Sequence, residues 1–188
     1  MPKVRTFIAV ELPERVRADV SGLQKDLAAS GLKLRWVQPQ NMHLTLKFLG
    51  DVERGSIGDI CTCVAAAAHR CPAFDLVPGG VGCFPGVKNP RVVWVGISGE
   101  LGSLRSLQAD VENALSPLGF KPEKRPYRGH LTIGRVKARP HPHKLAAALR
   151  NHLEFGSEGF TVDHVGVFQS VLQPEGPTYT RLCHLPLA

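Results

Sequence analysis

Two short stretches of the sequence share one pattern of residue types. Residues 43–50 read HLTLKFLG, and residues 130–135 read HLTIGR. In both, histidine is followed by leucine, threonine and an aliphatic residue. One copy of such a motif is weak support for a site, but two copies with matching flanks predict a functional pair. The repeat predicts two equivalent strands, one from each half of the chain, facing each other across a cleft.

The alternation within each stretch predicts which side chains share a face. In a strand, residues two apart point to the same side, so His43 is expected beside Thr45, and His130 beside Thr132. The intervening residues are all aliphatic and are expected to face a core: Leu44, Leu46, Leu131 and Ile133. The sequence therefore predicts a pseudo-twofold site with two imidazoles and two hydroxyls at its floor.

Two histidines in one cleft are typical of proton transfer during displacement at phosphorus. One imidazole takes a proton from the attacking oxygen while the other protonates the leaving oxygen. Histidine titrates near neutral pH, so a neutral and a charged ring can coexist. The hydroxyls of Thr45 and Thr132 would hold the phosphate oxygens as negative charge grows on them. This chemistry requires no metal ion and no cofactor, and the sequence has no Walker-type loop for ATP.

Hydrophobic periodicity predicts helices and strands that alternate along the chain. Helices are expected at residues 14–30, 57–69, 101–115 and 144–153, and strands at 4–11, 34–37, 43–49, 74–81, 91–97, 130–136, 160–168 and 178–184. This mixture favours an α/β or α+β fold over an all-β barrel and leaves the strand directions undecided. A single domain of two lobes is expected over residues 1–188.

The composition limits the class of protein. No apolar run reaches the roughly 18–20 residues of a membrane span, and a charge follows the start of the chain too soon for a signal peptide. A cytoplasmic protein without membrane contact is therefore expected. The five cysteines show no Cys-x-x-Cys spacing and are expected to be reduced, mostly buried thiols. The net charge of +7 favours phosphate-bearing partners.

The two stretches and their flanks resemble the 2H phosphoesterase superfamily, named for two His-x-Thr/Ser motifs. Within it, the chain is similar to the bacterial and archaeal RNA 2′,3′-cyclic phosphodiesterases once called 2′-5′ RNA ligases. The resemblance runs nearly end to end and rests on residues 5–13, 34–37, 41–50, 125–135 and 168–179. It implies a bilobed α+β fold, in which two antiparallel sheets surround a central cleft and helices lie outside.

The resemblance also implies an activity, which is hydrolysis of an RNA 2′,3′-cyclic phosphate end, or of a related cyclic nucleotide, to a 2′-phosphomonoester. His43 is then the general acid for the departing 3′ oxygen, and His130 is the general base that activates water. Thr45, Thr132 and Arg135 bind the substrate. Strict alternation, however, places Arg135 opposite His130, so Arg135 must lie at a strand end or after a β-bulge. A monomer is expected.

Three alternatives stay open. The same cleft could join a cyclic phosphate end to a 5′ hydroxyl and act as a 2′-5′ RNA ligase. Water is at about 55 M, so hydrolysis prevails unless a second RNA end is held tightly. The substrate could instead be a cyclic ADP-ribose phosphate or a 2′-5′ oligonucleotide. Finally, the chain could be a non-catalytic RNA-binding module that kept the cleft.

Several residues near the motifs have expected positions of their own. Alternation places Lys47 on the side of His43, where it meets either a nucleic-acid backbone or solvent, and places Phe48 in the core. Phe84 and Trp94 are expected to be core residues, with stacking on a base as the alternative. The remaining histidines match no motif and are expected at the surface or at helix ends: His69, His141, His143, His152, His164 and His184.

Overall fold

Helices and strands alternate along the chain as the periodicity predicted. The computed structural model describes residues 2–137, 140–174 and 176–188. The helices are α1 (Glu14–Ala29), α2 (Ile57–Ala68), α3 (Leu101–Leu115) and α4 (Pro142–Arg150). The strands are β1 (Lys3–Glu11), β2 (Leu34–Trp36), β3 (His43–Glu53), β4 (Phe74–Phe84), β5 (Val92–Gly99), β6 (His130–Val136), β7 (Phe160–Val162), β8 (His164–Gln173) and β9 (Gly176–Pro186). Every predicted element is present, although the strand expected over 160–168 is divided into β7 and β8.

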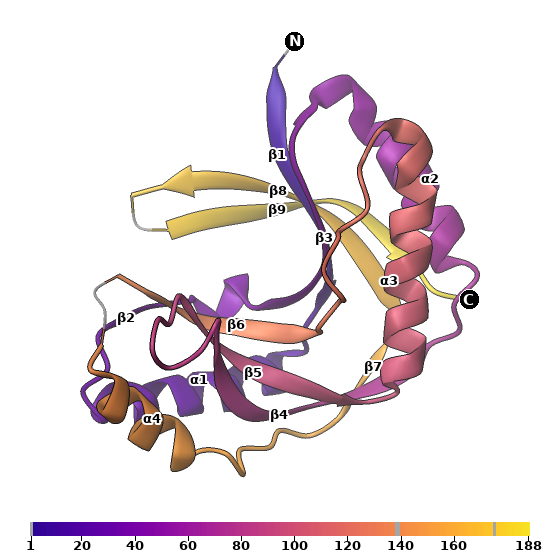
Figure 1. Ribbon diagram of the computed structural model, residues 1–188. Coiled ribbons are helices and arrows are strands. Elements are labelled where there is room, and N and C mark those ends of the chain that lie inside the picture. Colours follow the sequence, from indigo (N-terminus) through magenta and orange to yellow (C-terminus); the bar gives the residue numbers. More distant parts are fainter. Residues whose placement is uncertain (1, 138–139, 175) are drawn as a thin grey trace.

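The strands described form one curled antiparallel sheet in the order β7-β4-β5-β6-β3-β1-β8-β9, and β2 pairs with β6 (Figure 1). The two halves of the sheet meet where β3 and β6 pair at Leu44 and Leu131. The α+β fold is thereby confirmed, and the two expected sheets are the two halves of this continuous one. Each half combines strands from both halves of the chain, because β8 and β9 extend β1 while β4 and β5 extend β6.

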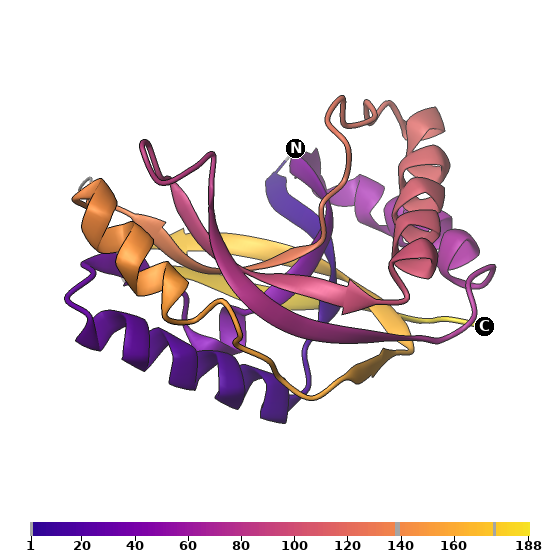
Figure 2. The same ribbon diagram turned by 60° about the horizontal axis from the view of Figure 1, so that its bottom comes forward.

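The helices form two pairs, with α2 beside α3 and α4 near α1 (Figures 1 and 2). Their apolar faces pack on the convex side of the sheet, and α1 buries the residues that its helical spacing predicted: Val16, Val20, Leu23 and Leu27. Leu44 and Leu131 are fully buried in this core. The opposite face of the central strands is thus left free for a cleft. No helix in the described ranges combines the length and apolarity needed to cross a membrane.

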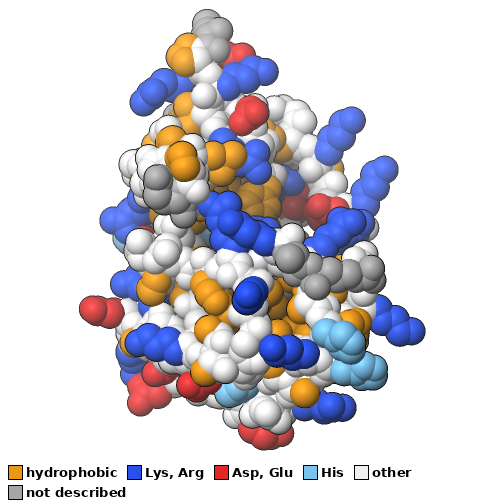
Figure 3. Space-filling model, turned by 90° about the vertical axis from the view of Figure 1, so that its left-hand side faces the viewer, with side chains coloured by type: hydrophobic (Ala, Val, Ile, Leu, Met, Phe, Trp, Pro, Cys, Tyr) orange, Lys and Arg blue, Asp and Glu red, His pale blue; other side chains and the backbone are white. Residues whose placement is uncertain are grey.

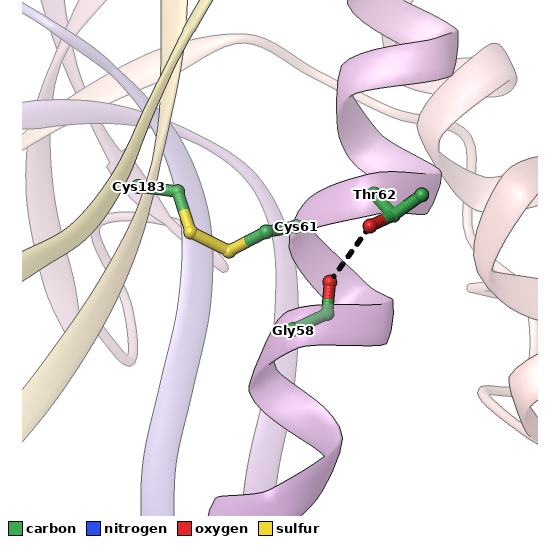
Figure 4. Close-up of a disulfide and its surroundings, with 4 residues drawn as sticks. All are labelled: Gly58, Cys61, Thr62 and Cys183. Carbon is green, nitrogen blue, oxygen red and sulfur yellow. Dashed lines mark hydrogen bonds between the residues drawn. A yellow bond between two sulfur atoms is a disulfide. The ribbon is translucent and has the colours of Figure 1, made fainter.

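A disulfide connects two elements on the convex side. Cys61 of α2 is bonded to Cys183 of β9, and the residues lie 122 positions apart in sequence (Figure 4). The expectation of reduced thiols is therefore wrong for this pair, while Cys63, Cys71 and Cys83 are free. The spacing could not reveal the bond, because the two cysteines become neighbours only when α2 packs against the end of β9.

We predict that this disulfide contributes strongly to stability. Closing a loop of 122 residues restricts the unfolded chain, and the chain-entropy estimate for that length is about 5 kcal/mol. Replacing both partners (Cys61→Ser with Cys183→Ser) should lower the free energy of unfolding, measured by urea denaturation, by about 3–5 kcal/mol. Cys63→Ser, on the same helix, should have little effect. Equal stability of the double variant and the wild type would contradict the prediction.

Candidate active site

The two motif strands lie side by side at the centre of the sheet. Leu44 of β3 pairs with Leu131 of β6 in an antiparallel register, which brings each histidine opposite the threonine of the other motif. In a regular ladder, residues diagonally placed on one face are roughly 7–8 Å apart, a spacing that lets a phosphate lie between the two rings. The histidines and threonines all line one cleft of about 720 Å³: His43, Thr45, His130 and Thr132.

Both imidazoles are held by the same local geometry. His43 Nδ1 donates to the carbonyl oxygen of Asn41, and His130 Nδ1 donates to that of Arg128, each at 2.8 Å. A carbonyl only accepts hydrogen bonds, so Nδ1 carries a proton in both rings. In each motif the acceptor precedes its histidine by two residues. Nε2 therefore remains in each ring as the nitrogen that can exchange a proton with a ligand.

Aromatic side chains from the flanking strands support the two rings. Phe7 of β1 stacks on His43 with ring centroids 4.7 Å apart, and Tyr179 of β9 meets the same ring edge-on at 5.3 Å. On the other side, Phe84 of β4 lies edge-on to His130 at 5.1 Å and also packs on Trp94. Trp94 pairs with Thr132 and so lies on the same face of the sheet, with Phe84 between it and His130. Neither residue is buried in the core, so the core expectation is wrong for both.

Each motif strand contains a β-bulge at the same position of the motif, and β3 has a second one at Leu49. In β3, Thr45 pairs with Ala9 and Lys47 pairs with Ile8, so the residue between them, Leu46, has no partner. In β6, Thr132 pairs with Trp94 and Gly134 with Val93, which leaves out Ile133. A single extra residue reverses the alternation beyond it. The residue five positions after each histidine, Phe48 or Arg135, consequently faces the cleft.

The bulges explain where three residues lie relative to their expected positions. Arg135 needed a bulge to share the face of His130, and it does line the cleft. Phe48 was expected in the core, which is wrong, because its side chain is 62% exposed and borders the cleft. Lys47 was expected on the cleft side or in solvent, which is also wrong. It is buried, forms an ion pair with Glu112 of α3, and donates to the carbonyl oxygen of Lys121 at 3.0 Å.

The buried ion pair makes a prediction for stability. Lys47→Met should lower the free energy of unfolding by about 3–5 kcal/mol, because it leaves the Glu112 carboxylate buried without its cation. Adding Glu112→Leu should recover most of this loss, since an apolar pair of similar volume is often as stable. Urea denaturation of the three proteins measures both steps. A single variant as stable as the wild type would show that the pair is not buried.

The cleft has a cationic lining. Arg5, Arg35 and Arg135 border it, and no aspartate or glutamate does so within the part of the chain that the structure describes. Figure 3 shows Lys and Arg side chains gathered around a hollow in which hydrophobic groups are visible. Mg²⁺ and Ca²⁺ favour carboxylate oxygens, whereas guanidinium groups bind phosphate directly. The lining therefore suits an anionic ligand that is held by the protein's own cations.

Sequence reasoning missed several residues of this site. Arg5, Arg35, Phe7 and Tyr179 all lie in the cleft. Each belongs to a flanking stretch that carried the family resemblance, so a signal was present without any indication of position. Tyr127 was missed as well, and its hydroxyl donates to the carbonyl oxygen of Thr45 at 2.9 Å, which fixes the first motif strand.

His43 differs electrostatically from an exposed histidine. The pKa of its ring is lowered from 6.5 to about 4, chiefly by burial and to a smaller extent by the nearby Arg135, while the hydrogen bond to the Asn41 carbonyl acts in the opposite direction. The ring is consequently neutral at pH 7 in the protein without ligand.

This low pKa predicts a pH dependence of stability. Between pH 6.5 and 4 the unfolded chain binds a proton at His43 that the folded chain does not. The free energy of unfolding should therefore fall as the pH falls through this range, by at most about 3 kcal/mol from this group. Urea denaturation should show a smaller loss between pH 7 and 4.5 for His43→Gln than for the wild type. The surface variant His69→Gln should match the wild type, and an unchanged loss in His43→Gln would refute the prediction.

A curled antiparallel sheet with two His-x-Thr strands beside a cationic cleft defines the class of two-histidine phosphoesterases. The chain belongs to the family of LigT like phosphoesterases. The sequence model of this family matches residues 10–94 and, a second time, residues 95–179. Each of the two matches contains one of the His-x-Thr stretches.

Similar proteins are found in archaea and bacteria. The RNA 2′,3′-cyclic phosphodiesterase of Methanothermobacter thermautotrophicus is 37% identical over 182 residues, which cover 96% of this chain and 97% of the relative. The one of Thermotoga maritima is 34% identical and covers 95% and 93%. Among solved structures, TT0787 of Thermus thermophilus superposes with a TM-score of 0.81 at 28% identity over 97% of both chains. Escherichia coli LigT in complex with 3′-AMP shares the fold, with a TM-score of 0.74 at 23% identity over 99% of both chains.

Proposed function

We propose that the protein hydrolyses the 2′,3′-cyclic phosphate end of RNA to a 2′-phosphomonoester, without a metal ion, by acid–base catalysis between His43 and His130. The observation that carries the proposal is the pair of imidazoles, each anchored through Nδ1 and directed into one cationic cleft. The relatives named as RNA 2′,3′-cyclic phosphodiesterases support the substrate class.

The proposed reaction needs two proton transfers, one from the attacking water and one to the departing oxygen on the opposite side of the phosphorus atom. His130 takes a proton from water as the water oxygen attacks phosphorus, and the P–O3′ bond breaks in line with it. His43 donates a proton to the departing 3′ oxygen, so the product has a free 3′ hydroxyl and a 2′-phosphate. Thr45, Thr132 and Arg135 would hold the non-bridging oxygens, whose charge increases in the transition state.

To act as the general acid, His43 must be protonated in the complex, so its pKa must rise when substrate binds. In the free protein that pKa is about 4, so the ring must gain a proton when substrate binds. A bound phosphate places negative charge beside the ring, which raises the pKa. Following the ring resonances by NMR, with and without a nucleoside 2′-phosphate, tests this step. A ring that stays neutral at pH 6 in the complex would exchange the two roles, with His43 as the base.

The residues after the bulges give the cleft two distinct ends. Phe48 is an exposed ring beside Phe7, with centroids 5.9 Å apart, and it offers a surface on which a base can stack. Arg135 occupies the equivalent place in the second motif and offers a guanidinium to the phosphate or the ribose. Because one chain supplies every described residue of the cleft, we propose that the monomer is active. An RNA substrate favours the cytoplasmic location expected from the sequence, whereas the Cys61–Cys183 disulfide is uncommon in cytosolic proteins.

The direct test uses a short RNA with a 2′,3′-cyclic phosphate end in the presence of a chelator. The wild type should release a 2′-phosphate, and His43→Ala and His130→Ala should each lower kcat by about 10²- to 10⁴-fold, because each removes one positioned proton carrier. Binding of the RNA should persist in both variants. His69→Ala, outside the cleft, is the control and should keep full activity.

The outcomes separate the remaining alternatives. No turnover by the wild type, with RNA still bound, would identify a binding module and refute the proposal. Activity that disappears with the chelator would refute its metal independence. Adding an RNA with a 5′ hydroxyl measures the reverse reaction, and more joined product than hydrolysed product would identify a ligase.

A further inference from the structure

A second group of ionisable side chains lies outside the cleft, at the base of the β8–β9 hairpin. Glu11 ends β1, His164 begins β8 and His184 lies near the end of β9, and one ligand atom from each lies within 4.8 Å of the others. None of the three lines the cleft. The pairing of β8 with both β1 and β9 brings these residues together, since Ala9 and His184 both pair with Gly166.

The His164 ring is placed between two carboxylates. Its Nδ1 lies 2.5 Å from Asp163 Oδ1, and its Nε2 lies 3.3 Å from Glu11 Oε2. A neutral imidazole has one N–H group, so it satisfies only one of these oxygens. The other ring nitrogen has a lone pair that can bind a cation. An N–H held by a carboxylate at Nδ1, with Nε2 as the ligand atom, is the usual outer arrangement of a metal-binding histidine.

The separations suit a small transition-metal ion. With bonds of about 2.0–2.1 Å to nitrogen and oxygen, neighbouring ligands of a tetrahedral Zn²⁺ lie roughly 3.3–3.4 Å apart, and the Glu11–His164 separation has this value. The ring centroids of His164 and His184 are 4.3 Å apart. Two imidazoles and one carboxylate form a donor set that Zn²⁺ accepts with a water as fourth ligand. Such a set disfavours Mg²⁺ and Ca²⁺, which bind oxygen ligands.

We propose that Glu11, His164 and His184 form a binding site for Zn²⁺, with Asp163 as a positioning residue that holds the ring of His164. Arg181 is the competing group, because its Nη1 lies 2.6 Å from Glu11 Oε2. Its side chain is 46% exposed and has room to leave when the metal binds. The site is independent of the proposed hydrolysis, whose histidines lie in the cleft.

Metal binding here would strengthen the wall of the cleft. One ion would link β1, β8 and β9, and the β8–β9 hairpin carries Tyr179, which contacts His43. At free Zn²⁺ about 100-fold above Kd, a ligand that binds only the folded state should raise Tm by roughly 5–10 °C for a chain of this size.

The test is calorimetric titration of the whole protein with Zn²⁺, using Mg²⁺ as the comparison. The wild type should bind one Zn²⁺, and His164→Ala and His184→Ala should each abolish this binding. Asp163→Asn should weaken it by about 10- to 100-fold, because it loosens the ligand ring. Arg181→Ala should bind as tightly as the wild type or more tightly, which an ion-pair cluster without a metal would not explain.

Controls separate this site from other Zn²⁺ ligands in the chain. The variant His141→Ala with His143→Ala removes another histidine pair, whose ring centroids are 5.5 Å apart, and should bind like the wild type. His184 is exposed, so His184→Ala keeps the test valid if His164→Ala does not fold. Co²⁺ in place of Zn²⁺ should show no thiolate charge-transfer band. Such a band, no saturable binding, or binding lost only in His43→Ala with His130→Ala would overturn the proposal.

Discussion

The structure of the cleft depends on one unpaired residue at the same position of each motif, Leu46 in β3 and Ile133 in β6. In a regular strand, every second side chain points to the same face. His43 and Thr45 would then lie on the face opposite to Phe48. The bulges at Leu46 and Ile133 remove this constraint. Each lets two successive residues, Leu46 with Lys47 or Ile133 with Gly134, stay on the buried side of the sheet, so that the next residue returns to the cleft.

The residues that follow the two bulges differ, although the two motif strands are otherwise equivalent. Behind the first, Lys47 reaches Glu112 on α3, which fixes the sheet against its helices. Behind the second, Gly134 faces β2, where an added Cβ would lie 3.2 Å from side-chain atoms of Leu34 and Trp36. In front, Phe48 and Arg135 present an apolar ring and a cation. The two motifs thus present the same histidine and threonine side chains, while the ends of the cleft differ in a way that suits a base and a phosphate.

The sequence predicts much of this arrangement, and its errors have physical causes. The repeat and the alternation were sufficient to find both histidines and both threonines and to place their aliphatic neighbours in the core. Lys47 and Phe48 were exchanged, because a bulge changes no residue type and so leaves no mark in a hydrophobic pattern. Arg135 could be placed only by noting that alternation and the family resemblance conflicted. Cys61 and Cys183, and likewise Glu11, His164 and His184, become neighbours through packing and strand pairing between distant segments, which one sequence does not reveal.

A crystal structure of the protein with a nucleoside 2′-phosphate would show whether both motif strands act on one phosphate. We expect Nε2 of His43 and Nε2 of His130 each to lie within hydrogen-bond distance of the same phosphate group, with Arg135 on that group and Phe48 against the base. A phosphate held by one histidine alone, or bound outside the cleft, would contradict it.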